Sequence, residues 1–250
     1  MTLKVDKNNI YVIGNRRKHG LSEYIHDFME NDFSIFVRAK IKKENLVPNK
    51  DAFMFSRNGQ HSGLSVYIDD MGQLCVRFCY WLHNGVLGSE IKNIDFMLQK
   101  EIEAEFNEYA VTCDNIKKVF YFYVNGVNVG VIDYDKQTKC NYSESFIWLG
   151  CGSMIMEEDW RNIGEFEYDL IFGLDKKLEI DVITDIAKNY EVKYISEDPN
   201  FNLPVLNDAM PYKDNFKIFT NFKNKTAYKI WNMVTNGNQF QFYIENNMYF

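Results

Sequence analysis

The chain has 250 residues, of which 46% are hydrophobic and 16% aromatic, and its formal net charge is −7. This length and apolar content suffice for one globular domain with a substantial core. The acidic balance argues against nucleic acid as a partner, because nucleic-acid-binding proteins neutralise phosphates with clustered Lys and Arg. No apolar segment is long enough to span a bilayer, so we expect no membrane insertion.

Short segments of alternating apolar and polar residues, separated by turn residues, predict a series of β-strands. Asp69 and Gly72 supply turn chemistry between two of them, and Asn125-Gly126 is the strongest short-range hairpin signal in the chain. Many short strands at this spacing favour a sandwich. The predicted strands are residues 33–41, 52–56, 63–69, 73–81, 106–113, 119–124, 127–132, 146–150 and 165–172.

Two segments of the chain predict short helices instead of strands. Residues 20–29 form the first, beginning near Ser22. Residues 181–190 form the second, because their apolar residues recur at helical spacing. We interpret Asp181 as the cap of this second helix.

The character of the sequence changes after Tyr190. Residues 191–213 contain three of the four prolines, which predicts an extended loop. The aromatic-rich and Asn-rich residues 216–250 predict added strands that pack on the sandwich. We therefore divide the chain into a domain at 1–190 and an extension at 191–250.

Several motifs follow one another in an order typical of one superfamily. They are Phe33-Ser34-Ile35-Phe36-Val37-Arg38-Ala39, Phe55-Ser56-Arg57, Gly63-Leu64-Ser65-Val66-Tyr67-Ile68, Tyr123-Val124-Asn125-Gly126, Trp148-Leu149-Gly150 and Gly164-Glu165-Phe166-Glu167-Tyr168-Asp169-Leu170-Ile171-Phe172, followed by Leu178 and a short helix. In this order they resemble the laminin-G-like branch of the concanavalin-A-like lectin and glucanase superfamily. The usual aromatic-His pair before the Tyr-Val-Asn-Gly hairpin is missing, because Asn107-Glu108-Tyr109-Ala110-Val111 stands in its place.

The resemblance implies an all-β fold. It would be an antiparallel jelly-roll sandwich of the concanavalin-A-like kind, with one or two short helices and a C-terminal β extension. The motifs do not specify a function, since this fold serves lectins, adhesion modules, toxin binding domains and hydrolases.

The cysteines and the N-terminus bear on the cellular compartment. Five cysteines are present and no two form a Cys-x-x-Cys pair, so zinc and thioredoxin-like chemistry are not supported. We expect all five to be reduced thiols in a reducing compartment. The first residues lack the apolar core of a signal peptide, which favours a cytoplasmic location. A surface or secreted role stays open as the alternative.

A candidate ligand-binding groove follows from strand alternation. If the predicted strands share one concave sheet, five side chains opposite the core line a groove. Aromatic rings there could stack on sugar rings, and Arg could hydrogen-bond hydroxyls or carboxylates. The alternative is that the chain after Pro211 covers this face and makes it a second core. The five residues are Tyr67, Arg77, Trp81, Tyr121 and Tyr123.

Three predicted loops add candidates at the rim of the sandwich. Arg57 and His83 lie in two of them, and loops on a rigid scaffold often carry binding residues. Trp160 lies in a third loop beside Glu157 and Asp159, which are weak candidate ligands for calcium. The alternative for all three loops is that they are plain solvated turns. No other cofactor is expected.

Pairs of carboxylates could indicate a catalytic site. Retaining glucanases of the superfamily place two carboxylates on one strand face. Glu179 and Asp181 begin such a run but lack the final Glu, whereas Glu165, Glu167 and Asp169 alternate along one predicted strand. A solvated strand face explains the latter set equally well, so we predict no catalytic residues.

The sequence therefore predicts a non-catalytic carbohydrate-binding module, with a glycan or surface polysaccharide as its partner. Two alternatives stay open. One is a protein-protein interaction or assembly module that uses the aromatic C-terminal segment, and the other is a glycoside hydrolase. The high Asn, Lys, Ile, Tyr and Phe content indicates an AT-rich bacterial or phage genome.

Overall fold

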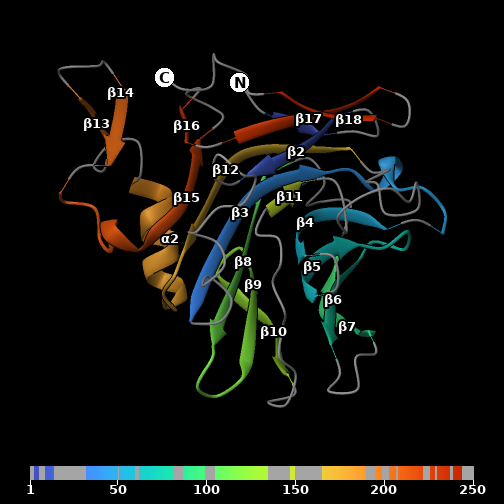
Figure 1. Ribbon diagram of the computed structural model, residues 1–250. Coiled ribbons are helices and arrows are strands. Elements are labelled where there is room, and N and C mark those ends of the chain that lie inside the picture. The colour runs from blue at the N-terminus through green and yellow to red at the C-terminus, as the bar shows by residue number, and fades with distance from the viewer. Residues whose placement is uncertain are drawn as a thin grey trace.

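The computed structural model describes most of the predicted strands and one α-helix (Figure 1). It describes residues 3–5, 9–13, 32–49, 51–59, 62–81, 87–98, 105–134, 147–149, 165–189, 195–198, 203–206, 208–221, 226–228, 230–236 and 239–243. No helix in this part of the chain has the length and apolar character needed to cross a membrane.

Two eight-stranded antiparallel sheets form the body of the molecule, and they are called sheet A and sheet B below. Sheet A has the order β10 (Val127–Asp133), β9 (Val119–Val124), β8 (Asn107–Asp114), β3 (Phe33–Ile41), β12 (Phe166–Leu174), β15 (Phe216–Asn221) and β16 (Thr226–Tyr228), with β1 (Leu3–Val5) also paired to β12. Sheet B has the order β18 (Gln239–Tyr243), β17 (Ile230–Asn236), β2 (Asn9–Ile13), β11 (Ile147–Leu149), β4 (Ala52–Gly59), β5 (Ser62–Ile68), β6 (Gln73–Trp81) and β7 (Leu87–Met97).

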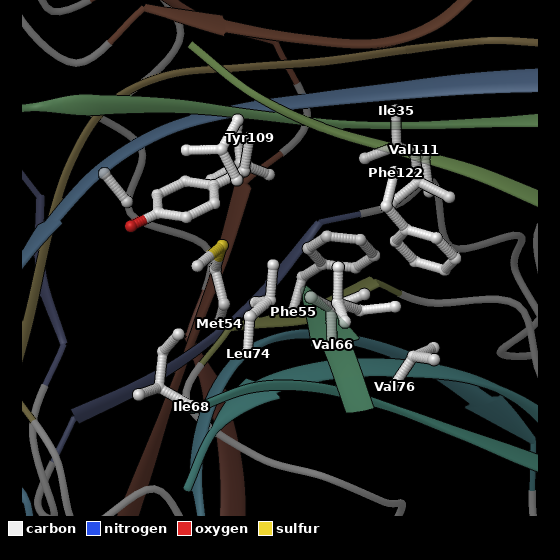
Figure 2. Packing of buried hydrophobic residues seen from close by; sticks show 14 of the residues in the cluster. Ile35, Met54, Phe55, Val66, Ile68, Leu74, Val76, Tyr109, Val111 and Phe122 are labelled. Atoms are coloured by element: carbon white, nitrogen blue, oxygen red, sulfur yellow. The ribbon is translucent and has the colours of Figure 1, made fainter. Parts of the chain in front are cut away.

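The main core lies between the inner faces of the two sheets, as Figure 2 shows. Successive side chains of a strand point to opposite faces, so alternate residues enter this core. On β9, for example, Phe120, Phe122 and Val124 are buried while Tyr121 and Tyr123 are only half-buried. Figure 2 shows side chains from sheet A facing side chains from sheet B: Ile35, Tyr109, Val111 and Phe122 from the former, and Met54, Phe55, Val66, Ile68, Leu74 and Val76 from the latter.

A polar contact also joins the two sheets through this core. The hydroxyl of Tyr168 on β12 donates a hydrogen bond to the carbonyl of Met54 on β4, at 2.5 Å. Tyr168 is 0% exposed, so its hydroxyl has no solvent to bond with. The bond satisfies a group that would otherwise be costly to bury.

The outer face of sheet A carries a second, smaller core beneath α2 (Ile180–Asn189). Ile183, Ile186 and Ala187 of the helix are buried against Phe36, Phe172 and their neighbours. Phe36 and Phe172 stack with ring centroids 4.7 Å apart. Figure 1 shows α2, in orange, on the side of sheet A that turns away from β4 to β7. The molecule therefore has three layers at this point: helix, sheet A and sheet B.

Strands after residue 190 lengthen the sheets. β15 pairs with β12 in sheet A, and β17 pairs with β2 in sheet B. β13 (Ile195–Asp198) and β14 (Leu203–Leu206) form a separate two-stranded sheet. β15, β16, β17 and β18 thus lie at the edges of the two main sheets, and the division into a domain at 1–190 and an extension at 191–250 stays a prediction.

Several predicted elements are confirmed with small shifts of boundary. Residues 33–41 and 73–81 are β3 and β6, and the predicted helix at 181–190 is α2, which begins at Ile180. Asp181 consequently lies in the first turn, where its carboxylate accepts a hydrogen bond from the N–H of Val182 at 2.9 Å. The other predicted helix, at residues 20–29, lies outside the described residues.

The structure differs from the sequence prediction at one loop and at one strand. The predicted loop that begins at Arg57 is shorter than expected, since β4 continues to Gly59 and β5 begins at Ser62. Strand β7 was not predicted, because polar residues occupy both faces of LGSEIKNIDFM and weaken the alternation. Polar and charged residues on both faces are typical of an edge strand, which β7 is in sheet B.

Candidate functional site

The predicted groove is not assembled by the fold. Tyr67 and Arg77 lie on β5 and β6 of sheet B, whereas Tyr121 and Tyr123 lie on β9 of sheet A. All four do lie opposite the main core, as the alternation predicts. The prediction was right about which face of each strand these residues occupy and wrong about the strands sharing one sheet. Alternation with a period of two residues shows which side of a strand is apolar, but it does not show which strands are neighbours.

Tyr67 and Arg77 belong to a compact polar cluster on the outer face of sheet B. The guanidinium of Arg77 lies 5.4 Å from the centroid of the Tyr67 ring, and its Nη2 is 3.1 Å from Oδ2 of Asp51. Tyr67 is only 3% exposed, so its ring offers no surface for a sugar to stack on. Sugar stacking on Tyr67 is therefore wrong for this structure, although the outer-face position was correct.

The titration behaviour of this cluster reflects its burial. Desolvation raises the pKa of the Cys75 thiol to about 12, with the carboxylates of Asp69 and Asp51 adding to the effect. Desolvation also raises the pKa of Tyr67, and it raises the pKa of Asp51 against the opposing influence of Arg77. Cys75 is therefore an unreactive thiol at neutral pH, and the cluster has the character of a buried structural network.

Tyr121 and Tyr123 lie beside the helix layer on the other side of the molecule. Tyr123 packs against the small core beneath α2. The ammonium group of Lys177 lies 5.0 Å from the centroid of the Tyr121 ring, and it also lies 3.6 Å from the carboxylate of Asp114. Both tyrosines thus have intramolecular partners, and the structure does not bring them near the sheet-B cluster.

The remaining predicted ligand-binding residues stay predictions. Trp81 is the last residue of β6, and Arg57 lies in β4. His83 and Trp160 lie outside the described residues, as do the two calcium candidates, Glu157 and Asp159. Among the residues that the structure describes, no three His, Cys, Asp or Glu side chains come together in a way that could hold a metal ion.

A surface pocket of about 110 Å³ lies where β1, β12 and the end of β3 meet, and it is called the lysine pocket below. Its lining residues are Lys4, Lys40, Lys42, Asn45, Glu165, Phe166 and Glu167. The strand pairing explains why these residues meet. Lys4 of β1 is the cross-strand partner of Glu167 on β12, and Glu167 is in turn the partner of Lys40 on β3.

Ion pairs and hydrogen bonds around the lysine pocket order its polar groups. Lys4 lies 3.9 Å from Glu167, and the side-chain amide of Asn45 donates a hydrogen bond of 3.4 Å to Glu165. Lys42 pairs with Glu44, outside the pocket, at 3.2 Å. Lys40 makes no ion pair with any residue that the structure describes. Its ammonium group is therefore the cation of the pocket that is left for a ligand.

The lining of the lysine pocket suits a polyhydroxylated ligand. Ammonium and amide groups donate hydrogen bonds, while the carboxylates of Glu165 and Glu167 accept them. Phe166 is 0% exposed and anchors this part of β12 in the main core. Lys4, Lys40 and Glu167 therefore project from paired strands whose other face is packed in the core, which positions their backbone before a ligand binds.

Two of the seven residues that line the lysine pocket were candidates from the sequence. Glu165 and Glu167 were recognised as alternating carboxylates, but Asp169 does not join them in the lysine pocket. A β-bulge separates Tyr168 from Leu170 in the pairing with β3, and Asp169 faces Arg38 instead, at 3.8 Å. The lysines were missed. The alternation of Lys40 and Lys42 was a usable signal, whereas nothing in the sequence indicated that residues 3–5 pair with β12.

Comparison with known proteins finds similar structures but no matching family. No protein-family model and no curated protein matches this chain. Solved structures do match. One is the CBM40 module of Ruminococcus gnavus IT-sialidase bound to α2,3-sialyllactose, with a TM-score of 0.50 and 10% identity, covering 72% of this chain and 92% of that one.

Two further structures match over nearly the whole chain. The binding domain of botulinum neurotoxin DC in complex with SialylT has a TM-score of 0.52 and 13% identity, and the match covers 96% of this chain and 68% of that one. A putative carbohydrate-binding protein of Bacteroides ovatus has a TM-score of 0.52 and 11% identity, with 96% and 55% covered. The chain is thus an all-β antiparallel sandwich of the jelly-roll kind, and its structural neighbours include carbohydrate-binding proteins of that architecture.

Proposed function

We propose that this chain is a non-catalytic glycan-binding module of the concanavalin-A-like, laminin-G-like type. The observation that carries the proposal is the lysine pocket, where ammonium, amide and carboxylate groups converge on one small cavity. Sugars present many hydroxyl groups that both donate and accept hydrogen bonds. A site with rigidly placed donors and acceptors can satisfy them at a low entropic cost.

The structural neighbours give this proposal independent support. The sialidase CBM40 structure is bound to α2,3-sialyllactose, the neurotoxin binding domain is in complex with SialylT, and the Bacteroides ovatus protein is named a putative carbohydrate-binding protein. These likenesses rest on fold at low sequence identity, so they favour a class of ligand and do not transfer particular residues.

The size of the lysine pocket limits how it can be used. Its volume of about 110 Å³ is small beside the roughly 300–1,000 Å³ of pockets that enclose a whole drug-sized ligand. We therefore propose that the pocket takes one sugar residue, or one substituent of it, from a longer chain lying along the surface. Such a mode of binding suits a surface polysaccharide.

A glycan array of the purified chain, probed with calcium and with chelator, tests the proposal. We expect binding to a restricted set of glycans, and affinities for the best of them are then measured by calorimetry. Glu165→Gln removes a charged acceptor and should weaken binding by about fivefold to tenfold. Glu90→Gln, an exposed carboxylate on β7, is the matched control and should leave the affinity unchanged.

Two other results would redirect the proposal. Binding that survives Glu165→Gln but is lost on Trp81→Ala would place the site at the end of β6. Binding that needs calcium would favour the loop carrying Glu157 and Asp159. A blank array with protein shown to be folded would reject the glycan-binding function.

A protein-interaction module is the second candidate function, and exposed apolar side chains on two edge strands favour it. Val127 and Val131 of β10 are 63% and 55% exposed, and Ile91 of β7 is 50% exposed. β10 ends sheet A and β7 ends sheet B, and the two strands contact each other. Exposed edges are sites where another chain can add a strand. Light scattering that shows a stable oligomer, lost on Val131→Lys, would support this function.

A further inference from the structure

We propose that the lysine pocket binds a negatively charged substituent of its glycan, a carboxylate or a sulfate, with Lys40 as the principal ligand. This inference rests on the proposed glycan-binding function and deepens it from a polar sugar to an acidic one.

The lysine pocket departs from the charge of the chain as a whole. The chain has 35 acidic residues against 28 Lys and Arg, giving −7. The residues that line the pocket carry three ammonium groups and two carboxylates, and Glu44 beside the pocket pairs with one of these ammonium groups, that of Lys42. Ammonium groups gathered in one place on an acidic protein favour an anionic group locally.

Two of the three lysines of the pocket have carboxylate partners within the protein. Lys4 lies 3.9 Å from Glu167, and Lys42 lies 3.2 Å from Glu44. Lys40 of β3, the cross-strand partner of Glu167, makes no ion pair with any residue that the structure describes. Its ammonium group can therefore accept an anionic partner without breaking an existing ion pair.

The two glutamates of the lysine pocket distinguish an acidic sugar from a simple anion. A bare phosphate or sulfate ion would meet Glu165 and Glu167 as repulsive neighbours. An acidic sugar places its charged group at Lys40 and presents hydroxyl groups to the carboxylates, which accept hydrogen bonds from them. The mixed lining thus matches a ligand that carries one negative charge among several hydroxyls.

Three probes with a common lactose core test this inference: lactose, 3′-sialyllactose and 3′-sulfolactose. We expect the two charged probes to bind more tightly than lactose, and their affinity to fall as salt is raised. Lys40→Gln should weaken the charged probes by roughly threefold to tenfold and leave lactose unchanged, because it removes a partly exposed charge. Lys40→Arg should retain the preference, since it keeps the charge.

Lys92→Gln is the control for a general change in net charge. Lys92 is a partly exposed lysine that pairs with Glu90 on β7, in the other sheet. Its replacement should leave all three affinities as they are. A difference between the sialylated and the sulfated probe identifies which anion the pocket prefers.

The possible failures of the two proposals can be told apart. Equal binding of lactose and its charged derivatives, unchanged by Lys40→Gln, would overturn the acidic-ligand inference and leave glycan binding intact. A blank glycan array together with Lys40-dependent binding of free N-acetylneuraminic acid would reject the glycan module but support an anion site. Binding of none of these probes would overturn both.

Discussion

Ser34 on β3 and Thr112 on β8 are direct cross-strand partners, and both are 0% exposed, yet only Ser34 has hydrogen bonds for its hydroxyl. Ser34 Oγ donates to the carbonyl of Lys176 at 2.8 Å and accepts from the N–H of Leu178 at 2.9 Å. It thereby fastens the segment that leads into α2 onto sheet A. Thr112 Oγ1 has no hydrogen-bond partner among the described residues.

This contrast predicts opposite effects for two similar substitutions. Ser34→Ala should lower the free energy of unfolding by about 1–3 kcal/mol, because it leaves the buried N–H of Leu178 without a partner and removes the bond to the part-buried carbonyl of Lys176. Thr112→Val should be neutral or stabilising by up to about 1 kcal/mol, since it replaces an unsatisfied hydroxyl with a methyl group of the same shape. Guanidinium-induced unfolding of both variants measures the difference. Equal losses in the two variants would contradict it.

We predict that breaking the ion pair between Arg77 and Asp51 lowers the free energy of unfolding by an amount that depends on pH. Burial raises the pKa of Asp51 above its usual value, and Arg77 opposes this rise. Arg77→Gln removes the opposing charge and should cost about 1–2 kcal/mol at neutral pH, since the pair is largely but not fully buried. A carboxyl with a raised pKa destabilises the fold when it is ionised, and this cost shrinks once the pH falls below the folded pKa and is gone below the unfolded pKa.

The loss in Arg77→Gln should therefore be largest at neutral pH and shrink in acid. Unfolding curves of the wild type and the variant at about pH 7 and about pH 4.5 measure it. Lys92→Gln serves as the surface control and should shift stability by only a few tenths of a kcal/mol. A loss that grows as the pH falls would show that Asp51 is not the group responsible.

In the turn between β9 and β10, we predict that a substitution of Gly126 lowers stability through the backbone conformation alone. Asn125 has φ 50° and Gly126 has φ 80°, both in the left-handed region. A Cβ at Gly126 would meet nothing within 4 Å, so Gly126→Ala should cost about 1 kcal/mol through its backbone conformation only. Gly126→Asn should recover part of this loss, since Asn tolerates positive φ. Thermal unfolding of the two variants decides between backbone strain and packing.

Two of the cysteines should resist alkylation in the native state. Burial raises the pKa values of the Cys75 and Cys113 thiols to about 12, and both are free thiols. Little thiolate therefore forms at about pH 8, and access is closed as well. Mass spectrometry after iodoacetamide treatment should find both unmodified in native protein and fully modified in denaturant. Rapid native labelling of Cys75 would show that the sheet-B cluster opens.

The sequence predicted strands well where apolar residues alternate. β3, β5, β6, β8, β9, β10 and β12 all lie close to their predicted ranges. The Asn125-Gly126 turn was read from two residues whose conformational preference is local. Strand β7 was not predicted because neither of its faces is consistently apolar. The short strands β1 and β2 have too few residues to show an alternating pattern.

The candidate site was harder to predict because it depends on pairing between distant segments. The lysine pocket exists because β1 and β3 flank β12, which brings Lys4 and Lys40 to either side of Glu167. Alternation places each residue on a face, but the order of strands in a sheet is set by the global packing of the chain. The same limit explains why Tyr67 and Tyr121 were expected in one groove and lie in different sheets.

The position of β2 has a consequence for how the protein is made. β2 lies between β11 and β17 in sheet B, so a strand from the beginning of the chain joins a middle strand to one near the end. During synthesis the first of these strands leaves the ribosome long before β17 and β18 exist. Sheet B can therefore be completed only after translation of this segment ends. Folding dominated by such non-local pairing takes about milliseconds to seconds, and until it finishes the edge of β2 is open to other chains.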